Sequence, residues 1–136
     1  MSGWPEARAL RKATTQAVAD FLHDEIFARH GCLTIIFVDG GSENKGMVDD
    51  VCNLYSIKKH TVTANHPQAN GIVERGHKQL VDGLSKAWVK DSIKKWPEYL
   101  VLILWADQIT VRKSTKFSPF ELVYGRKCML PINVIF

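Results

Sequence analysis

The sequence of 136 residues contains few cysteines and no long apolar run. Its three cysteines, Cys32, Cys52 and Cys128, are widely spaced and form no C-x-x-C pair, so neither a disulfide framework nor a zinc site is indicated. The longest apolar run, around residues 99–106, is much shorter than the roughly 20 residues of a membrane-spanning helix. We therefore expect an intracellular protein with reduced cysteines and no membrane segment.

The charge balance is only mildly basic. Lys and Arg number 18 against 14 Asp and Glu, which gives a formal net charge of +4 and a pI near 9.0. This excess favours polyanionic partners. Hydrophobic residues make up 46% and charged residues 24%, as in an ordinary globular protein. The length fits one domain covering residues 1–136.

Apolar periodicity predicts alternating helices and strands in the first half of the chain. A helix is expected over residues 14–29, with Thr14 or Thr15 as N-cap and Gly31 as the stop. The continuous apolar run at 32–38 is typical of a strand buried on both faces. A second helix is expected over 47–55, and a second strand over 57–63. The apolar side of that second helix is expected to carry Met47, Val51, Leu54 and Tyr55.

The second half is expected to be helical. A long helix is predicted over about 72–89, and Pro97 should open another that runs to about residue 111. Ser118 and Pro119 should begin a short helix that ends before Gly125. Strands interleaved with helices indicate an α/β fold.

Two carboxylates occupy positions where a site could form. Asp39 follows the first strand, and Glu74 lies in the first turn of the long helix. Ligands bind at the carboxyl ends of strands in open α/β sheets, which favours Asp39 as a site residue. Each residue also has an ordinary structural role, since Asp before Gly-Gly commonly forms turns and Glu commonly complements a helix N-terminus.

The sequence motifs around these two residues carry more information than the positions of the two residues alone. V-D-G-G-S-E-N at 38–44 and H-P-Q-A-N-G-I-V-E-R-G-H at 66–77 resemble the second and third blocks of the D,D-E signature in integrases of gypsy-class LTR retrotransposons. The flanks W-P-E-A-R at 4–8, H-G at 30–31 and S-P-F-E-L-V-Y-G at 118–125 are similar to that family as well. The chain thus resembles an integrase catalytic core over most of its length.

The resemblance implies a ribonuclease-H-like α/β fold and a metal-dependent site. In this family three carboxylates hold two divalent ions, Mg²⁺ or Mn²⁺, and hard oxygen ligands suit such ions. Asp39 and Glu74 are implied as catalytic metal ligands, and Lys78 and Arg75 as nucleic-acid-binding residues. Lys78 could equally be a solvated partner of Glu74, which precedes it by four residues. His77 is better explained as an exposed residue of the helix than as a metal ligand or a base.

The family's first catalytic Asp lies before the W-P-E-A-R segment, and here only residues 1–3 precede Trp4. No residue matches that Asp, because Asp20 and Asp24 fall within the first helix and belong to no matching motif. The expectation is therefore a partial fold: the remnant of a mixed sheet flanked by helices, helix-rich because the first strands are missing. An apolar strand edge would then be exposed.

By resemblance, the function is DNA integration through metal-dependent phosphodiester cleavage and strand transfer. The implied partner is DNA, both element ends and target, with a possible homo-oligomer and a nuclear location. The alternative is a non-catalytic, retroelement-derived module that binds nucleic acid or protein.

Overall fold

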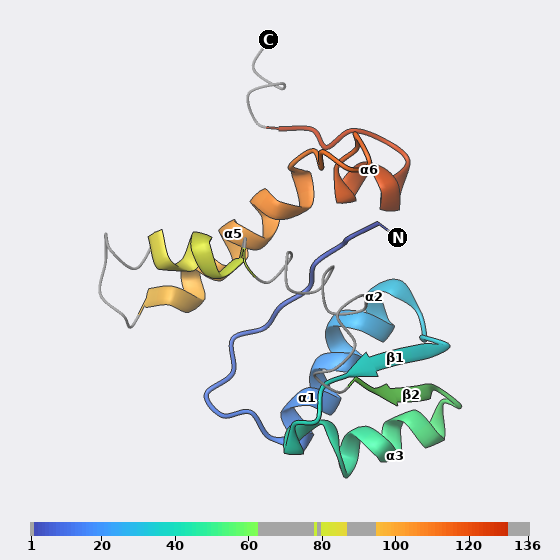
Figure 1. The fold of residues 1–136 in the computed structure, drawn as a ribbon. Helices are drawn as coiled ribbons and strands as arrows, with labels where there is room; N and C mark the ends of the chain where they lie inside the picture. The colour runs from blue at the N-terminus through green and yellow to red at the C-terminus, as the bar shows by residue number, and fades with distance from the viewer. Residues whose placement is uncertain (1, 63–77, 79, 87–94, 131–136) are drawn as a thin grey trace. The chain divides into compact units, whose positions relative to one another are not determined.

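The computed structural model describes residues 2–62, 78, 80–86 and 95–130 (Figure 1). Two compact units divide the chain: one is Arg8–Val73, and the other combines Met1–Ala7 with Glu74–Phe136. Among the described residues, no helix is both long and apolar enough to cross a membrane.

The first secondary structure of the unit Arg8–Val73 is a continuous helical stretch. It consists of α1 (Thr15–Phe21), a π-helical segment η1 (Leu22–Phe27) and α2 (Ala28–His30). The Thr14 hydroxyl accepts a hydrogen bond from the Ala17 amide at 3.2 Å, and Gly31 with φ of 86° ends the stretch. The helix predicted over 14–29 is confirmed, while its π-helical middle was not anticipated.

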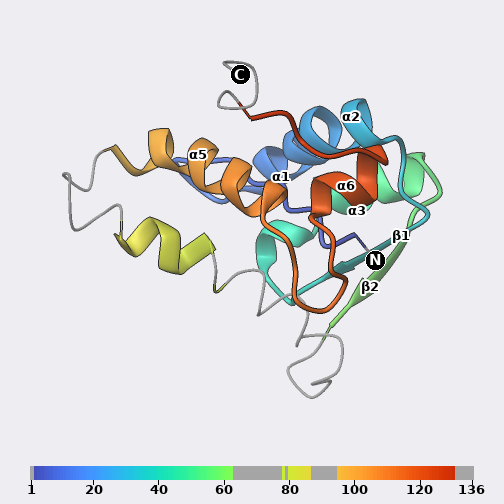
Figure 2. The ribbon, with the colours of Figure 1, turned by 90° about the horizontal axis from the view of Figure 1, so that it is seen from above.

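Two parallel strands follow in the same unit. The strands are β1 (Ile35–Val38) and β2 (Lys58–Thr61), and they run side by side in Figures 1 and 2 with Ile36 paired to Lys59. The short 3-10 helix η2 (Ser42–Asn44) and α3 (Met47–Leu54) connect them. A crossover helix between parallel strands is the βαβ arrangement that such a pair requires.

The core of this unit lies on one side of the strands. It is formed by Leu22, Val48, Cys52 and Ile57, with Ile36 packed against them. Burial on both faces, as predicted for β1, is therefore wrong: Ile35 and Phe37 are 45% and 65% exposed. Successive strand side chains point to opposite faces, and in the described part of the chain only the Ile36 face is packed against helices.

The predicted buried face of α3 is also wrong in part. Val48, Val51 and Cys52 are buried, whereas Leu54 is 74% exposed and Tyr55 lies beyond the last helical residue. Positions spaced three and four residues apart face the core together, and the smaller side chains occupy them.

The second unit is helical where it is described. Its elements are helical residues 78 and 80–86, α5 (Trp96–Ile109) and α6 (Pro119–Tyr124). Gly83 lies against α5, since a Cβ there would be 2.8 Å from Ile103 Cγ2. The helices predicted at Pro97 and Ser118 are confirmed, and Ser118 forms a complete capping box.

Trp4 joins the N-terminal segment to this second unit. Its ring lies 6.4 Å from Phe120 and 5.6 Å from Tyr124, and the Gln108 side chain donates to the Pro5 carbonyl at 3.1 Å. The ring contacts with α6 and the Gln108 hydrogen bond thus fix Trp4 and Pro5 within this unit.

Candidate metal and nucleic-acid site

Asp39 lies directly after β1, at the carboxyl end of a parallel strand. Its Oδ1 accepts two hydrogen bonds, from the Gly41 amide at 3.1 Å and from Asn44 Nδ2 at 2.6 Å. Within the described residues, Oδ2 has no hydrogen-bond partner, and the side chain is exposed. One oxygen is therefore held in place while the other can receive a ligand.

Lys59 on β2 contacts and stabilises the loop that follows Asp39. Lys59 Nζ donates to the Asn44 carbonyl at 2.7 Å and forms an ion pair with Asp49 in the first turn of α3. The Lys59 ammonium lowers the pKa of Asp49 below its usual value. The residues around Asp39 thus form an ordered loop rather than an isolated carboxylate.

The other predicted site residues are placed only in part. Glu74, Arg75 and His77 lie outside the described residues, so the convergence of Asp39 and Glu74 stays a prediction. Lys78 is described, as a helical residue with an exposed side chain. The described residues contain no group of three or more His, Cys, Asp or Glu side chains that could hold a metal ion.

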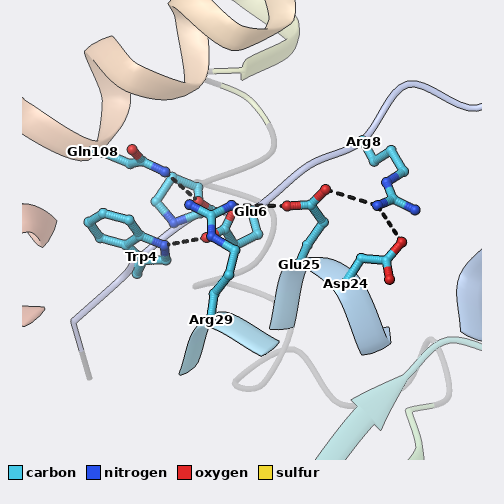
Figure 3. Close-up of polar contacts among 8 residues, drawn as sticks. Trp4, Glu6, Arg8, Asp24, Glu25, Arg29 and Gln108 are labelled. Atoms are coloured by element: carbon cyan, nitrogen blue, oxygen red, sulfur yellow. Dashed lines mark hydrogen bonds and ion pairs between the residues drawn. The ribbon is translucent and has the colours of Figure 1, made fainter. Parts of the chain in front are cut away.

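The two aspartates that precede β1, Asp20 and Asp24, have partners of their own, as Figure 3 shows for Asp24. Asp24 forms an ion pair with Arg8 at 2.8 Å, and Arg8 also contacts Glu25 at 3.0 Å. Hydrogen bonds from Arg8, and then from Arg29, hold the pKa of Glu25 below its usual value. Asp20 accepts from the Gln16 side chain at 2.7 Å. Asp24 and Glu25 therefore tie Arg8 to the first helical stretch, and Asp20 makes a contact within α1; all three have structural roles.

Sequence reasoning missed several residues. Asn44 stood inside the quoted motif and could have been considered as a partner for Asp39. Lys59 could not, because its contact with the loop depends on the register between two strands. Four exposed cations near α6 were also not considered: Lys113, Lys116, Arg126 and Lys127.

Sequence comparison finds relatives among retroelement polyproteins, although no family model matches. The chain is 28% identical over 119 residues to the Retrovirus-related Pol polyprotein from transposon 412 of Drosophila melanogaster. It is 32% identical over 125 residues to the Gag-Pol polyprotein of Feline leukemia virus. These matches cover 87% and 91% of this chain but only 10% and 7% of the two relatives, so the chain spans a small part of their length.

Solved structures of integrases share the fold. The catalytic core domain of BIV integrase matches with a TM-score of 0.73 and 24% identity, over 89% of this chain and 78% of that one. A chain of the simian T-cell lymphotropic virus intasome, solved in complex with PP2A regulatory subunit B56 gamma, matches with a TM-score of 0.79 and 20% identity, over 96% and 47%.

The fold is that of an integrase catalytic core, and the predicted ribonuclease-H-like α/β class is confirmed. The sequence relatives are Pol and Gag-Pol polyproteins. The chain thus combines the fold of integrase catalytic cores with sequence similarity to retroviral and retrotransposon Pol polyproteins.

Proposed function

We propose that this chain carries two of the metal-binding carboxylates of a gypsy-class integrase core, Asp39 and Glu74. The reaction would be metal-dependent cleavage and joining of DNA phosphodiesters. The observation that carries this proposal is Asp39 itself, which follows a parallel strand of an integrase-type fold with one carboxylate oxygen fixed and the other unbonded among the described residues.

The donor chemistry of Asp39 fits a hard divalent cation. Mg²⁺ and Mn²⁺ prefer carboxylate oxygens, and an ordered carboxylate binds them at a lower entropic cost than a mobile one. Asp39 and Glu74 would hold the ion. When bound, such ions activate the attacking oxygen and stabilise the leaving oxygen of a phosphodiester. The chain's own contribution is to fix Asp39 Oδ1 through Gly41 and Asn44.

Cations would hold DNA against this site. We assign this role to Arg75 and Lys78, which closely follow Glu74 in the sequence. Contacts to phosphate position DNA without reading its sequence, so binding should be salt-sensitive and sequence-independent. One structural neighbour is a chain of an intasome. As part of the proposal, this chain also assembles on DNA, as a possible homo-oligomer, in the nucleus.

Metal binding is the direct test. Titration of the 136-residue protein with Mn²⁺, followed by electron paramagnetic resonance, should show a site that Asp39→Asn and Glu74→Gln each weaken by about tenfold or more, since even outer-shell changes cost ~10–100-fold. Asp24→Asn is the matched control because Asp24 pairs with Arg8. Equal weakening by the control, or none in the Asp39 variant, would contradict the assignment.

DNA binding is tested separately with labelled duplexes of unrelated sequence. Lys78→Ala should weaken binding to all of them alike and reduce the slope of log affinity against log salt by about 0.9, the value for one phosphate contact. Lys12→Ala is the control, because Lys12 is also exposed and belongs to none of the integrase-like motifs. DNA binding without any Mn²⁺ site would favour the non-catalytic nucleic-acid-binding module instead.

A further inference from the structure

Lys59 occupies an unusual place for a strand lysine. It pairs in register with Ile36, which packs against the core, so both side chains emerge on the helix-covered face of the two strands. Its side chain is only 17% exposed. The ammonium contacts the Asn44 carbonyl in η2 and the Asp49 carboxylate in α3, so one cation connects β2 with both elements that follow β1.

The contact with Asn44 leads directly to Asp39. Lys59 holds the Asn44 backbone through its carbonyl, and the Asn44 side chain reaches back five residues to Asp39 Oδ1 at 2.6 Å. With the Gly41 amide on the same oxygen, the carboxylate is fixed about its side-chain torsions. The Asn44 backbone amide also donates to the Gly41 carbonyl at 3.2 Å. Without Lys59, Asn44 would keep that bond but lose the one to its carbonyl, and its side chain would hold Asp39 less firmly in one rotamer.

We propose that Lys59 is a positioning residue that acts through Asn44 to orient the Asp39 carboxylate for a divalent cation. This rests on the proposed function, in which Asp39 is a metal ligand. Ligands must be held within about 0.5 Å of the productive geometry by a supporting shell of packed and hydrogen-bonded residues, and Lys59 and Asn44 have that arrangement.

Charge and positioning give opposite expectations, which makes the role of Lys59 testable. A cation near a metal site repels the metal, so removal of the Lys59 charge alone would strengthen metal binding. Loss of positioning would weaken it, because the carboxylate must then be ordered when the ion binds. The sign of the change in affinity after Lys59 is replaced therefore separates the two roles.

The experiment compares Lys59→Met with Lys58→Met in the 136-residue protein, using Mn²⁺ titration as the readout. Lys58 is the adjacent residue on β2, is exposed and pairs with Ile35, so its replacement removes the same charge without touching the loop. Lys59→Met should weaken Mn²⁺ binding by about tenfold, within the range for outer-shell partners, and Lys58→Met should leave it unchanged or slightly tighter. Lys59→Arg, which keeps a donor, should recover part of the loss.

Asn44→Ala provides an independent variant that leaves Lys59 in place. It should weaken Mn²⁺ binding as much as Lys59→Met, and the double variant should lose little more, since both changes interrupt one path. The side-chain amide signals of Asn44 in ¹H–¹⁵N spectra should shift in Lys59→Met without metal. The Asp49→Asn variant, which breaks only the ion pair, should retain most of the affinity.

The outcomes distinguish this inference from the proposed function. If Asp39→Asn weakens Mn²⁺ binding while Lys59→Met and Asn44→Ala do not, Asp39 is a ligand and the positioning role is overturned. If Asp39→Asn has no effect, the metal site itself is wrong, and the positioning role fails with it. Circular dichroism of each variant shows whether it is folded. If Lys59→Met is unfolded, Lys59→Arg together with Asn44→Ala decides the question: unchanged Mn²⁺ binding in both overturns the positioning role.

Discussion

Replacing Val48 by Ala should destabilise the protein far more than replacing the larger Leu54, although both residues lie on α3. Val48 is fully buried in the core with Leu22, Cys52 and Ile57, whereas Leu54 is 74% exposed. The buried change removes two carbon atoms, which at about 0.8 kcal/mol per buried CH₂ corresponds to roughly 1.6 kcal/mol. The unfilled cavity adds to this cost, while the higher helix propensity of Ala returns up to about 0.7 kcal/mol.

The expected loss for Val48→Ala is therefore about 1.5–3 kcal/mol in the free energy of unfolding. Leu54→Ala should change it by less than about 0.5 kcal/mol, as for other exposed positions. Urea unfolding followed by far-ultraviolet circular dichroism measures both, with the shift of the midpoint multiplied by the slope m giving the difference.

This comparison also decides which face of α3 is buried. The apolar pattern of the sequence favours the Leu54 side, and the structure favours the Val48 side. A larger loss for Leu54→Ala than for Val48→Ala would refute the packing described for this unit.

Three further changes have definite expected outcomes. Ser118→Ala removes the capping box of α6 and should cost about 1 kcal/mol in thermal unfolding followed by tryptophan fluorescence, whereas the exposed Ser114→Ala should have no effect. The Lys59 ion pair lowers the pKa of Asp49 below its ordinary value of 3.8, so the pair stabilises the fold at pH values above 3.8. This stabilisation is lost as the pH falls through the pKa of Asp49 in the folded state. Asp49→Asn should therefore flatten the acid part of the curve of unfolding free energy against pH, measured by urea titration. Burial raises the pKa of the Cys52 thiol, so iodoacetamide should label the exposed Cys32 well before Cys52 in mass spectra, and equal labelling would contradict the burial of α3.

Local features of the fold were predictable from the sequence because short-range chemistry fixes them. The first helical stretch begins after Thr14 and ends at Gly31, and α6 begins after Ser118 and ends at Gly125. The hydrogen bonds and backbone angles that set these ends involve only neighbouring residues. The integrase resemblance likewise rested on contiguous motifs, and the fold agrees with it.

What the sequence could not decide depends on contacts between distant segments. Whether Val48 or Leu54 faces the core depends on where α3 meets the first helical stretch, and the exposure of Phe37 depends on what covers each face of the strands. The link from Lys59 to Asn44 arises only when β1 and β2 pair in one register, because a shift of one residue would turn Lys59 to the opposite face. The sequence by itself thus determined the ends of the first helical stretch and of α6, the approximate places of the two strands and the candidate ligand Asp39. Only the tertiary structure decided which side chains are buried and which residues hold that ligand, since side-chain direction is set by packing between elements and not by the order of residues along the chain.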